Sequence, residues 1–170
     1  MILIDGDMLV YRVGFACDEE TEDVATQTLD NYLSEMVMDL SEHYTSSIVY
    51  LTGKGNFRDE VAVTQPYKGN RDDKRVPVHK NLLRDFMVSE WNAQVVDGME
   101  ADDAIAIKAT ELDHNAIICS LDKDFKQIPC SMYDYTKKNL NAFKPDDAMR
   151  WLYKQALMGD RVDNIPGIYG

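Results

Sequence analysis

Short apolar runs recur along the chain, separated by longer segments whose apolar positions follow a helical period. The runs are short enough to be buried strands; they lie at Ile2 to Ile4, Ile48 to Leu51, Ala93 to Val96, Ala116 to Cys119 and Met132 to Tyr135. The longer segments predict helices at about residues 22–44, 77–90, 101–112 and 145–158, with Pro77 and Pro145 suited to first turns. This alternation predicts a three-layer α/β fold with a mostly parallel central sheet flanked by helices.

The length and composition predict one domain spanning residues 1–170, since 170 residues with 45% hydrophobic content can bury a sizeable core. No apolar run reaches the roughly 18 residues that a membrane span needs, and the start of the chain lacks the basic flank of a signal peptide. Cys17, Cys119 and Cys130 are odd in number and form no CxxC pair, which favours a reducing compartment. We therefore expect a soluble, cytoplasmic protein with no membrane partner.

The charge is strongly acidic but unevenly distributed. The formal net charge is −12, yet residues 54–84 hold eight basic and four acidic residues, a local net of +4. The rest of the chain, with 10 basic and 26 acidic residues, carries −16. A uniformly acidic surface would repel nucleic acid. A basic strip beside an acidic remainder instead suits a protein that holds cations in one place and phosphates next to them.

Acidic residues follow the predicted strands where each one ends. Asp5 comes directly after the first strand, Asp122 and Asp124 follow the fourth, and Glu100 to Asp103 open the helix after the third. Ligands of open α/β sheets gather at the carboxyl ends of the strands. These side chains are therefore expected to lie at one edge of the sheet.

Each acidic cluster also has an ordinary explanation when taken alone. Acids in a first helical turn complement the helix dipole, and acids in a turn are commonly solvated. Asp160 and Asp163, however, follow a predicted helix C-terminus, where they oppose the dipole. All-carboxylate ligands suit a hard cation, Mg²⁺ or Mn²⁺, rather than structural Zn²⁺. Together the clusters predict a metal site formed by Asp5, Glu100, Asp102, Asp103, Asp122, Asp124, Asp160 and Asp163.

A basic segment supplies the second half of the predicted site. Gln65-Pro66-Tyr67-Lys68-Gly69-Asn70-Arg71 places an aromatic ring and two cations around a glycine. Tyr67 can stack on a base, while Lys68 and Arg71 can neutralise a scissile phosphate. A solvated basic loop with Tyr67 packed inward explains the same residues equally well. The neighbouring Lys74 and Arg75 extend the candidate nucleic-acid-binding set.

These motifs together resemble the 5′-nuclease superfamily of flap endonucleases and bacteriophage 5′→3′ exonucleases, which share a PIN-like catalytic domain; the podovirus-type exonucleases are the most similar. The resemblance covers residues 2–170. It rests on Leu3-Ile4-Asp5-Gly6, on Phe57-Arg58 leading to Tyr67-Lys68-Gly69-Asn70-Arg71, on Glu100-Ala101-Asp102-Asp103, on Ser120-Leu121-Asp122-Lys123-Asp124-Phe125, and on Gly159-Asp160-Arg161-Val162-Asp163-Asn164-Ile165-Pro166-Gly167.

The resemblance implies two-metal hydrolysis of phosphodiester bonds in DNA ends, flaps or RNA primers during phage replication or recombination. It implies that Asp5, Glu100, Asp102, Asp122 and Asp124 lie nearest two Mg²⁺ or Mn²⁺ ions. Asp103, Asp160 and Asp163 would complete the cluster, partly through waters. Lys68 and Arg71 would stabilise the transition state. Asp7 is an additional acid to which the resemblance assigns no role.

The chain departs from the family pattern at two places. The family usually has an aspartate after the second strand, where this chain has Gly53 in Leu51-Thr52-Gly53-Lys54-Gly55. The second departure is at the end of the sequence. Residues 165–170 correspond to the start of the helix-three-turn-helix that binds duplex DNA in the family, and the sequence stops before the rest of that motif. The remainder is expected either to have been truncated or to be supplied by a second chain.

Two other functions compete with a nuclease. Asp5-Gly6-Asp7 is similar to the nucleophile motif of haloacid-dehalogenase-type phosphatases, but Leu9 stands where those enzymes need Thr or Val. Gly53 and the missing duplex anchor favour instead a catalytically weak nucleic-acid-binding or replisome subunit. Metal-dependent cleavage of DNA distinguishes these possibilities.

Overall fold

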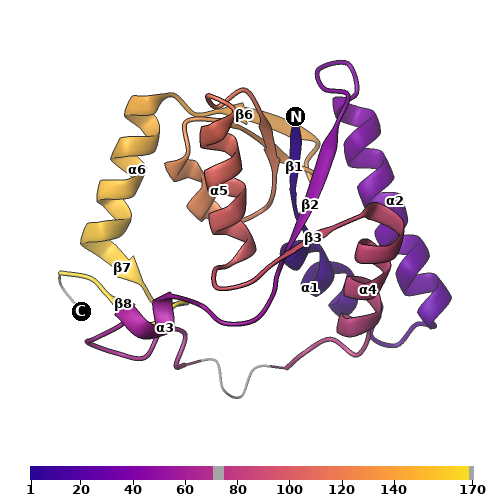
Figure 1. Ribbon diagram of the computed structural model, residues 1–170, viewed down its shortest axis with the longest axis horizontal. Helices are drawn as coiled ribbons and strands as arrows, with labels where there is room; N and C mark the ends of the chain where they lie inside the picture. Colours follow the sequence, from indigo (N-terminus) through magenta and orange to yellow (C-terminus); the bar gives the residue numbers. More distant parts are fainter. Residues whose placement is uncertain (71–74, 169–170) are drawn as a thin grey trace.

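A six-stranded sheet in the order β3-β2-β1-β4-β5-β6 forms the centre of the computed structural model (Figure 1). The structure describes residues 1–70 and 75–168. The sheet strands are β1 (Ile2–Asp5), β2 (Ser47–Thr52), β3 (Gln94–Val96), β4 (Ile117–Cys119), β5 (Ser131–Asp134) and β6 (Asn139–Ala142). The helices are α1 (Gly6–Ala16), α2 (Glu22–Leu40), α3 (Arg58–Val61), α4 (Lys80–Trp91), α5 (Ala101–Glu111), the 3-10 helix η1 (Lys123–Gln127) and α6 (Pro145–Met158). A hairpin of β7 (Gly159–Asp160) and β8 (Ile165–Pro166) follows α6.

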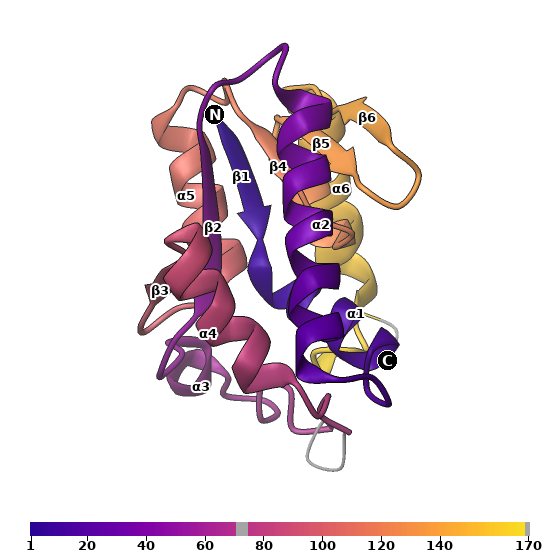
Figure 2. The ribbon, with the colours of Figure 1, turned by 90° about the vertical axis from the view of Figure 1, so that its right-hand side faces the viewer.

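Helices cover both faces of the sheet, which gives the three layers that the sequence predicts. Figure 2 shows α5 on one side of β1 and β2, and α2 on the other. One apolar core lies between the sheet and helices α1, α2 and α4; a second lies between the sheet and α5. In α2, the buried positions Ala25, Leu29, Leu33, Met36 and Leu40 repeat every three or four residues, so one stripe of the helix faces the core.

Strand direction brings the functional segments together. β1, β2, β3, β4 and β5 pair in parallel, so their carboxyl ends lie at one edge of the sheet. β1 ends at Asp5, and the chain then turns directly into α1. Buried side chains fill both faces of the central strands, which is why these strands read as continuous apolar runs.

The sequence pattern predicted the fold and four of the five long helices, but it missed several elements. Helix α1 was not predicted, although Leu9, Val10 and Val13 are buried along it. The edge strand β6 was not predicted because all of its side chains are exposed and half of them are asparagines. Pro77 does not begin a helix, since α4 starts at Lys80; Pro145, in contrast, occupies the first turn of α6.

All three cysteines are buried and unpaired. Within the described residues, no helix combines the length and the apolar composition that a bilayer crossing requires.

The buried stripe of α2 gives a direct test of the core. Leu29 is fully buried, whereas Val24 on the same helix is 43% exposed. We expect Leu29→Ala to lower the free energy of unfolding by about 2–5 kcal/mol, because it removes buried methyl groups and leaves a cavity. Val24→Ala is the control and should change it by less than about 0.5 kcal/mol. Urea denaturation followed by circular dichroism measures both values, and equal losses would contradict this packing.

Candidate metal and nucleic-acid site

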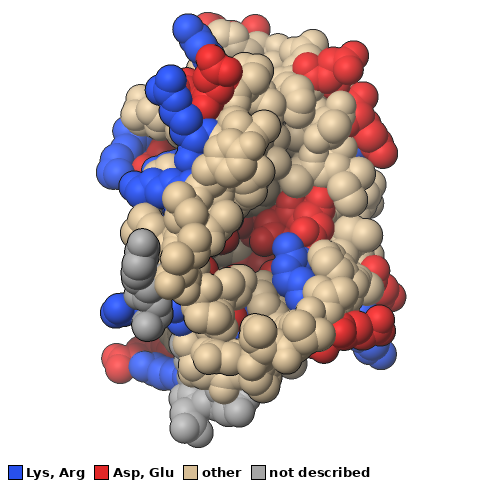
Figure 3. Space-filling view, turned by 90° about the vertical axis from the view of Figure 1, so that its left-hand side faces the viewer, with Lys and Arg blue, Asp and Glu red and all other residues tan. Residues whose placement is uncertain are grey.

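A cleft of about 580 Å³ opens at the edge where β1, β2 and β4 end. Five carboxylates line it, together with three cations; the lining includes Asp5, Asp7, Glu100, Asp102, Asp122, Lys68, Lys80 and Arg84. We call this cavity the carboxylate cleft. In the space-filling view, acidic side chains gather in a hollow of the surface with a basic side chain beside them (Figure 3). Four of the eight predicted metal ligands and one predicted cation therefore lie together in this cleft.

Asp5 is the most buried of these carboxylates. One of its oxygens caps α1 by accepting the Met8 N–H at 3.1 Å, and the other accepts the Ser120 hydroxyl at 2.7 Å. Burial and, to a smaller extent, the charges of Asp7 and Asp122 raise the pKa of Asp5 to about 6, although both hydrogen bonds oppose the shift. Asp5 is thus held in place at the floor of the cleft, where positive charge is scarce.

Asp122 reaches the cleft from the end of β4. Its backbone N–H donates to the Ser120 hydroxyl at 3.0 Å, so one serine connects Asp122 with Asp5. The Asp122 side chain begins η1 by accepting the Asp124 N–H at 2.9 Å. Asp124 points to α6, where Gln155 donates to its carboxylate, and does not line the carboxylate cleft.

The third contribution comes from the start of α5. Glu100 and Asp102 line the cleft, whereas Asp103 turns back to cap the helix and forms a two-pronged ion pair with Arg58. Burial, together with the neighbouring charges of Glu100 and Asp103, raises the pKa of Asp102 to about 7. The predicted trio is therefore divided between the cleft and a structural ion pair.

The last two predicted ligands, Asp160 and Asp163, lie on the hairpin that follows α6. Asp160 pairs with Lys123 at 2.7 Å, and Asp163 accepts the Tyr67 hydroxyl at 3.2 Å. Neither residue is among those that line the carboxylate cleft. Asp163 is linked to the cleft through Tyr67, because the Tyr67 hydroxyl also lies within hydrogen-bond distance of Glu100, at 3.0 Å.

The basic segment lies against this hairpin and directs Lys68 into the cleft. The Lys68 N–H donates to the Asp163 carbonyl at 3.1 Å, and the Asn164 side chain donates to the Pro66 carbonyl at 3.0 Å. Lys68 adopts a left-handed backbone with a φ of 54°, a conformation that non-glycine residues seldom keep without support from their surroundings. Its ammonium contacts Glu100 at 2.5 Å and lies 4.9 Å from the Tyr67 ring centre. Arg71 and Lys74 lie outside the described residues.

The cleft has the chemical composition of a hard-cation site. In the described part of the chain, no three Asp, Glu, His or Cys side chains form a ready-made metal cage. Asp5, Asp102 and Asp122 form no ion pair with any described residue, while Glu100 pairs with Lys68 and Asp7 with Arg84. Unpaired carboxylates gain from a cation, and the raised pKa values of Asp5 and Asp102 show the cost of their charge. Oxygen ligands suit Mg²⁺ or Mn²⁺. These residues therefore fit a divalent metal.

Four residues of the cleft were not identified from the sequence. Asp7 accepts the Thr52 N–H at 2.9 Å and pairs with Arg84 at 2.7 Å, so it lies at the end of β2. Tyr11 follows Asp7 by four residues, and Lys80 precedes Arg84 by four, so each pair shares one face of a helix. This spacing was the available signal; for Asp7 and Tyr11 it was missed because α1 was not predicted.

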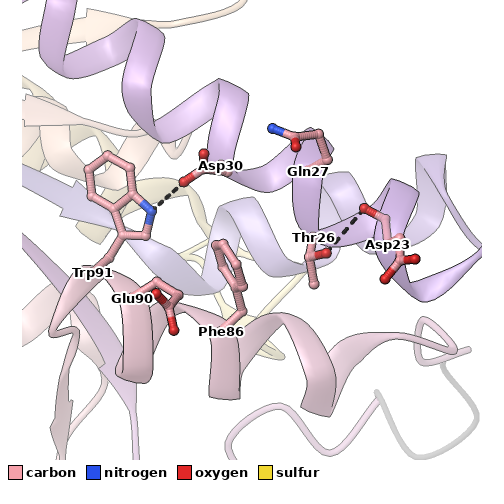
Figure 4. A pocket seen from close by; sticks show the side chains of 7 residues that line it. All are labelled: Asp23, Thr26, Gln27, Asp30, Phe86, Glu90 and Trp91. Atoms are coloured by element: carbon pink, nitrogen blue, oxygen red, sulfur yellow. Dashed lines mark hydrogen bonds between the residues drawn. The ribbon is translucent and has the colours of Figure 1, made fainter.

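A second cavity, of about 660 Å³, lies between α2 and α4 and has a different character (Figure 4). Its lining combines acids with two aromatic rings, and Trp91 donates to Asp30 at 2.9 Å. It contains none of the predicted site residues and no cation. The carboxylate cleft is therefore the candidate site, although it is the smaller of the two cavities.

Comparison with known proteins agrees with this geometry. Residues 1–152 match the family model described as 5′-3′ exonuclease, N-terminal resolvase-like domain. This chain belongs to the 5′-3′ exonuclease family. DNA polymerase I of Bacillus caldotenax is 30% identical over 196 residues, covering 100% of this chain and 22% of the polymerase. The 5′-3′ exonuclease of Mycoplasma pneumoniae is 30% identical, covering 99% of this chain and 67% of that protein.

Solved structures show the same fold. A flap endonuclease of bacteriophage T5, solved as a pseudo-enzyme-product complex with DNA and metal ions, aligns with a TM-score of 0.75 at 20% identity. The alignment covers 99% of this chain and 70% of that one. The chain spans about a fifth of the polymerases that it matches and about two thirds of the separate exonucleases. The three-layer PIN-like fold predicted from the sequence is confirmed.

The structure explains why this member of the 5′-3′ exonuclease family has a glycine after β2. A Cβ at Gly53 would lie 2.1 Å from the Asp97 carboxylate and 2.7 Å from the Val96 carbonyl. Asp97 holds this position by accepting the Lys54 N–H at 2.6 Å. A side chain on residue 53 therefore requires Asp97 and the β3 backbone to shift, while the Asp7 carboxylate bonds to the adjacent Thr52 N–H.

Restoring an aspartate at this position is expected to destabilise the protein. Gly53→Asp should lower the free energy of unfolding by about 1–3 kcal/mol, because the new side chain overlaps Asp97 and the β3 backbone. Thermal unfolding of Gly53→Asp and of the double variant Gly53→Asp/Asp97→Gly checks whether overlap with Asp97 causes the loss of stability. Removing Asp97 should recover part of the loss, since only the Val96 overlap remains; no recovery would contradict the assignment.

The Arg58–Asp103 pair is expected to stabilise the start of α5. Arg58→Gln should lower the free energy of unfolding by about 1–2 kcal/mol, because it leaves Asp103 partly buried without its two-pronged partner. The control is Lys108→Gln, which removes an exposed pair with Glu111 and should cost less than about 0.5 kcal/mol. Chemical denaturation of both variants measures this difference, and similar values would rule out a special role for Arg58.

Proposed function

We propose that this chain carries the metal-dependent catalytic centre of a 5′-nuclease, which hydrolyses phosphodiester bonds in DNA or RNA-primer substrates. The observation that supports this most is the meeting of Asp5, Asp102 and Asp122, from the ends of different elements, in one cleft with Lys68. Family membership favours this activity over a dehalogenase-type phosphatase. The relatives that carry the names exonuclease and flap endonuclease support the same activity.

The carboxylates would hold the metal. Asp5, Glu100, Asp102 and Asp122 would bind Mg²⁺ or Mn²⁺, with two ions as the proposed number; Asp103, Asp124, Asp160 and Asp163 would surround them. When bound, such cations neutralise phosphate charge and lower the pKa of a water molecule. Ser120 contributes by orienting both Asp5 and Asp122 through its hydroxyl group.

Lys68 would bind the scissile phosphate. Its ammonium is half-buried against Glu100 and the Tyr67 ring, so little solvent competes for it. A substrate phosphate entering the cleft would share this ammonium with Glu100 and stabilise the negative charge that develops during hydrolysis. The rigid backbone at Lys68 holds the group in position before substrate arrives. Arg71, Lys74 and Arg75 are proposed to assist in binding the nucleic acid.

A catalytically weak nucleic-acid-binding subunit is the second candidate. The observation that favours it is the crowding at Gly53, which leaves the end of β2 without its expected metal ligand. DNA would then bind to the same basic residues without rapid cleavage.

One assay separates the two candidates. We expect Mg²⁺- or Mn²⁺-dependent cleavage of 5′-labelled flap and blunt duplex DNA by the wild-type chain, with Asp122→Asn inactive because it removes a metal-binding charge. Lys68→Ala should lower kcat by about 10²–10³-fold, comparable to the loss of one transition-state donor. DNA binding without metal-dependent cleavage by the wild type would exclude the nuclease and favour the binding subunit.

A metal titration tests the proposed metal site directly. Calorimetric titration with Mn²⁺ should show saturable binding that weakens at least about 10-fold in Asp102→Asn, because ligand charge sets affinity for hard cations. Glu111→Gln, which removes an exposed carboxylate that pairs with Lys108 outside the cleft, serves as the control for net charge. Unchanged affinity in Asp102→Asn would show that the metal lies elsewhere.

A further inference from the structure

Three cations and one tryptophan line a third cavity, which lies where α6 packs against η1. It measures about 330 Å³, and its lining combines basic, aromatic and small side chains: Lys126, Ala142, Phe143, Asp147, Arg150, Trp151 and Lys154. None of these residues lines the carboxylate cleft. Figure 3, which views the molecule from the side of α6, shows basic side chains gathered at one margin of that face. We call this cavity the α6 cavity.

The cations of the α6 cavity lack acidic partners. Lys126, Arg150 and Lys154 form no ion pair with any described residue, although acids outnumber cations 30 to 18 in the chain. Two of them contact Trp151 instead, with the Lys126 ammonium 4.8 Å and the Lys154 ammonium 5.0 Å from its ring centre. Asp147 also lines the cavity without an ion pair, so three positive charges and one negative give a net +2. Positive charge therefore stays uncompensated here in an acidic protein.

Contacts outside the cavity hold its walls in place. The Gln155 side chain donates to the Asp124 carboxylate and accepts from the Gln127 side chain at 2.6 Å, which fixes α6 against η1. The Phe143 N–H donates to the Cys130 carbonyl at 3.2 Å, and the Phe143 ring packs against the core beside α5. The lining residues of α6 recur every three or four positions and so share one face: Asp147, Arg150, Trp151 and Lys154.

The surface between the cations is apolar. Ala142, Phe143 and Trp151 supply it, and Trp151 is only half-buried. The indole N–H of Trp151 is nevertheless buried and has no hydrogen-bond partner among the described residues. Buried donors usually have an acceptor. The α6 cavity therefore suits a ligand that combines negative charge and acceptor oxygens with an apolar group.

We propose that the α6 cavity binds an acidic peptide segment of a partner protein. An apolar side chain of that segment would lie against Phe143 and Trp151, and its carboxylates would pair with Lys126, Arg150 and Lys154. An apolar anchor in a pocket with charged residues at its rim is the arrangement that gives protein interfaces their affinity and specificity. This inference is independent of the proposed function, because such binding requires neither metal nor cleavage.

Two features favour a peptide over a nucleic-acid strand. The basic lining is bordered by acids, since η1 begins with Asp124 in its first turn and α6 begins with Asp146 and Asp147. A phosphate backbone carries a charge at every nucleotide and would meet these carboxylates, whereas a short peptide can place its few charges at the cations alone. A base stacking on Trp151 would also compete with the two ammonium groups that already contact the ring.

The test is titration with a synthetic peptide of alternating Asp and Phe, followed by tryptophan fluorescence. Trp91→Phe is the background, because the chain has two tryptophans and this change leaves Trp151 as the reporter. The peptide should change the emission saturably. Its counterpart with Ala in place of Phe should bind at least about 10-fold more weakly, since the buried ring is lost. A counterpart with Asn in place of Asp should also bind more weakly; equal binding of all three peptides would overturn the proposal.

Variants of the cavity locate the binding. Arg150→Gln and Lys154→Gln should each weaken binding about 3-fold, the size expected for an exposed ion pair, and together about 10-fold. Lys108→Gln is the control, because it removes the same charge on α5, outside the cavity. It should bind like its background. No loss in the double variant, or an equal loss in the control, would contradict the assignment, with circular dichroism confirming that each variant is folded.

Competitors distinguish the peptide from other anions. Neither inorganic phosphate nor a single-stranded oligonucleotide should displace the peptide when present at the same concentration. Displacement by the oligonucleotide that is lost in the double variant would make nucleic acid the ligand and overturn the peptide proposal; displacement by phosphate would reduce the site to a general anion site. Failure of the proposed nuclease appears separately, as absence of Mg²⁺-dependent cleavage, and leaves these titrations unchanged.

Discussion

Mutual repulsion among carboxylates is the constraint that governs the rest of this structure. The parallel sheet delivers acids from several strand ends to one edge, and burial makes their charges costly. Several of these acids form ion pairs with cations from distant parts of the sequence: Glu100 with Lys68, Asp7 with Arg84, Asp103 with Arg58 and Asp160 with Lys123. The acids without such a partner among the described residues mark where the proposed metal cation would bind.

The same pairings fix elements that the apolar cores do not reach. Helix α3 buries no residue, yet Arg58 ties it to the start of α5 through Asp103. The segment around Lys68 contributes little to either core, and it is fixed by hydrogen bonds to the hairpin after α6. Electrostatic compensation thus positions the walls of the cleft, while hydrophobic burial positions its floor. Preorganisation of this kind is what allows fixed charges to act strongly on a ligand.

The sequence was most informative where burial repeats at regular intervals. Apolar runs and helical periods identified the sheet and most helices, and the strand-end rule placed Asp5, Glu100, Asp102 and Asp122 in one cleft. The rule could not show which acids turn away. Asp103 and Asp124 occupy motifs as acidic as their neighbours, and their direction depends on Arg58 and Gln155, residues remote in sequence. Contacts between residues remote in sequence produce no periodic pattern along the chain, so the direction of these side chains could not be predicted from it.

The close contact between Gly53 and Asp97 also constrains how the site can change over time. Because one carboxylate occupies the space that the other would need, the two positions cannot be altered independently. A lineage that acquires an acid at position 53 while Asp97 persists passes through an overcrowded intermediate. The accessible route alters position 97 first and loses the hydrogen bond to the Lys54 N–H on the way. The order of substitutions, and not only their sum, therefore decides which carboxylate arrangements this fold can reach.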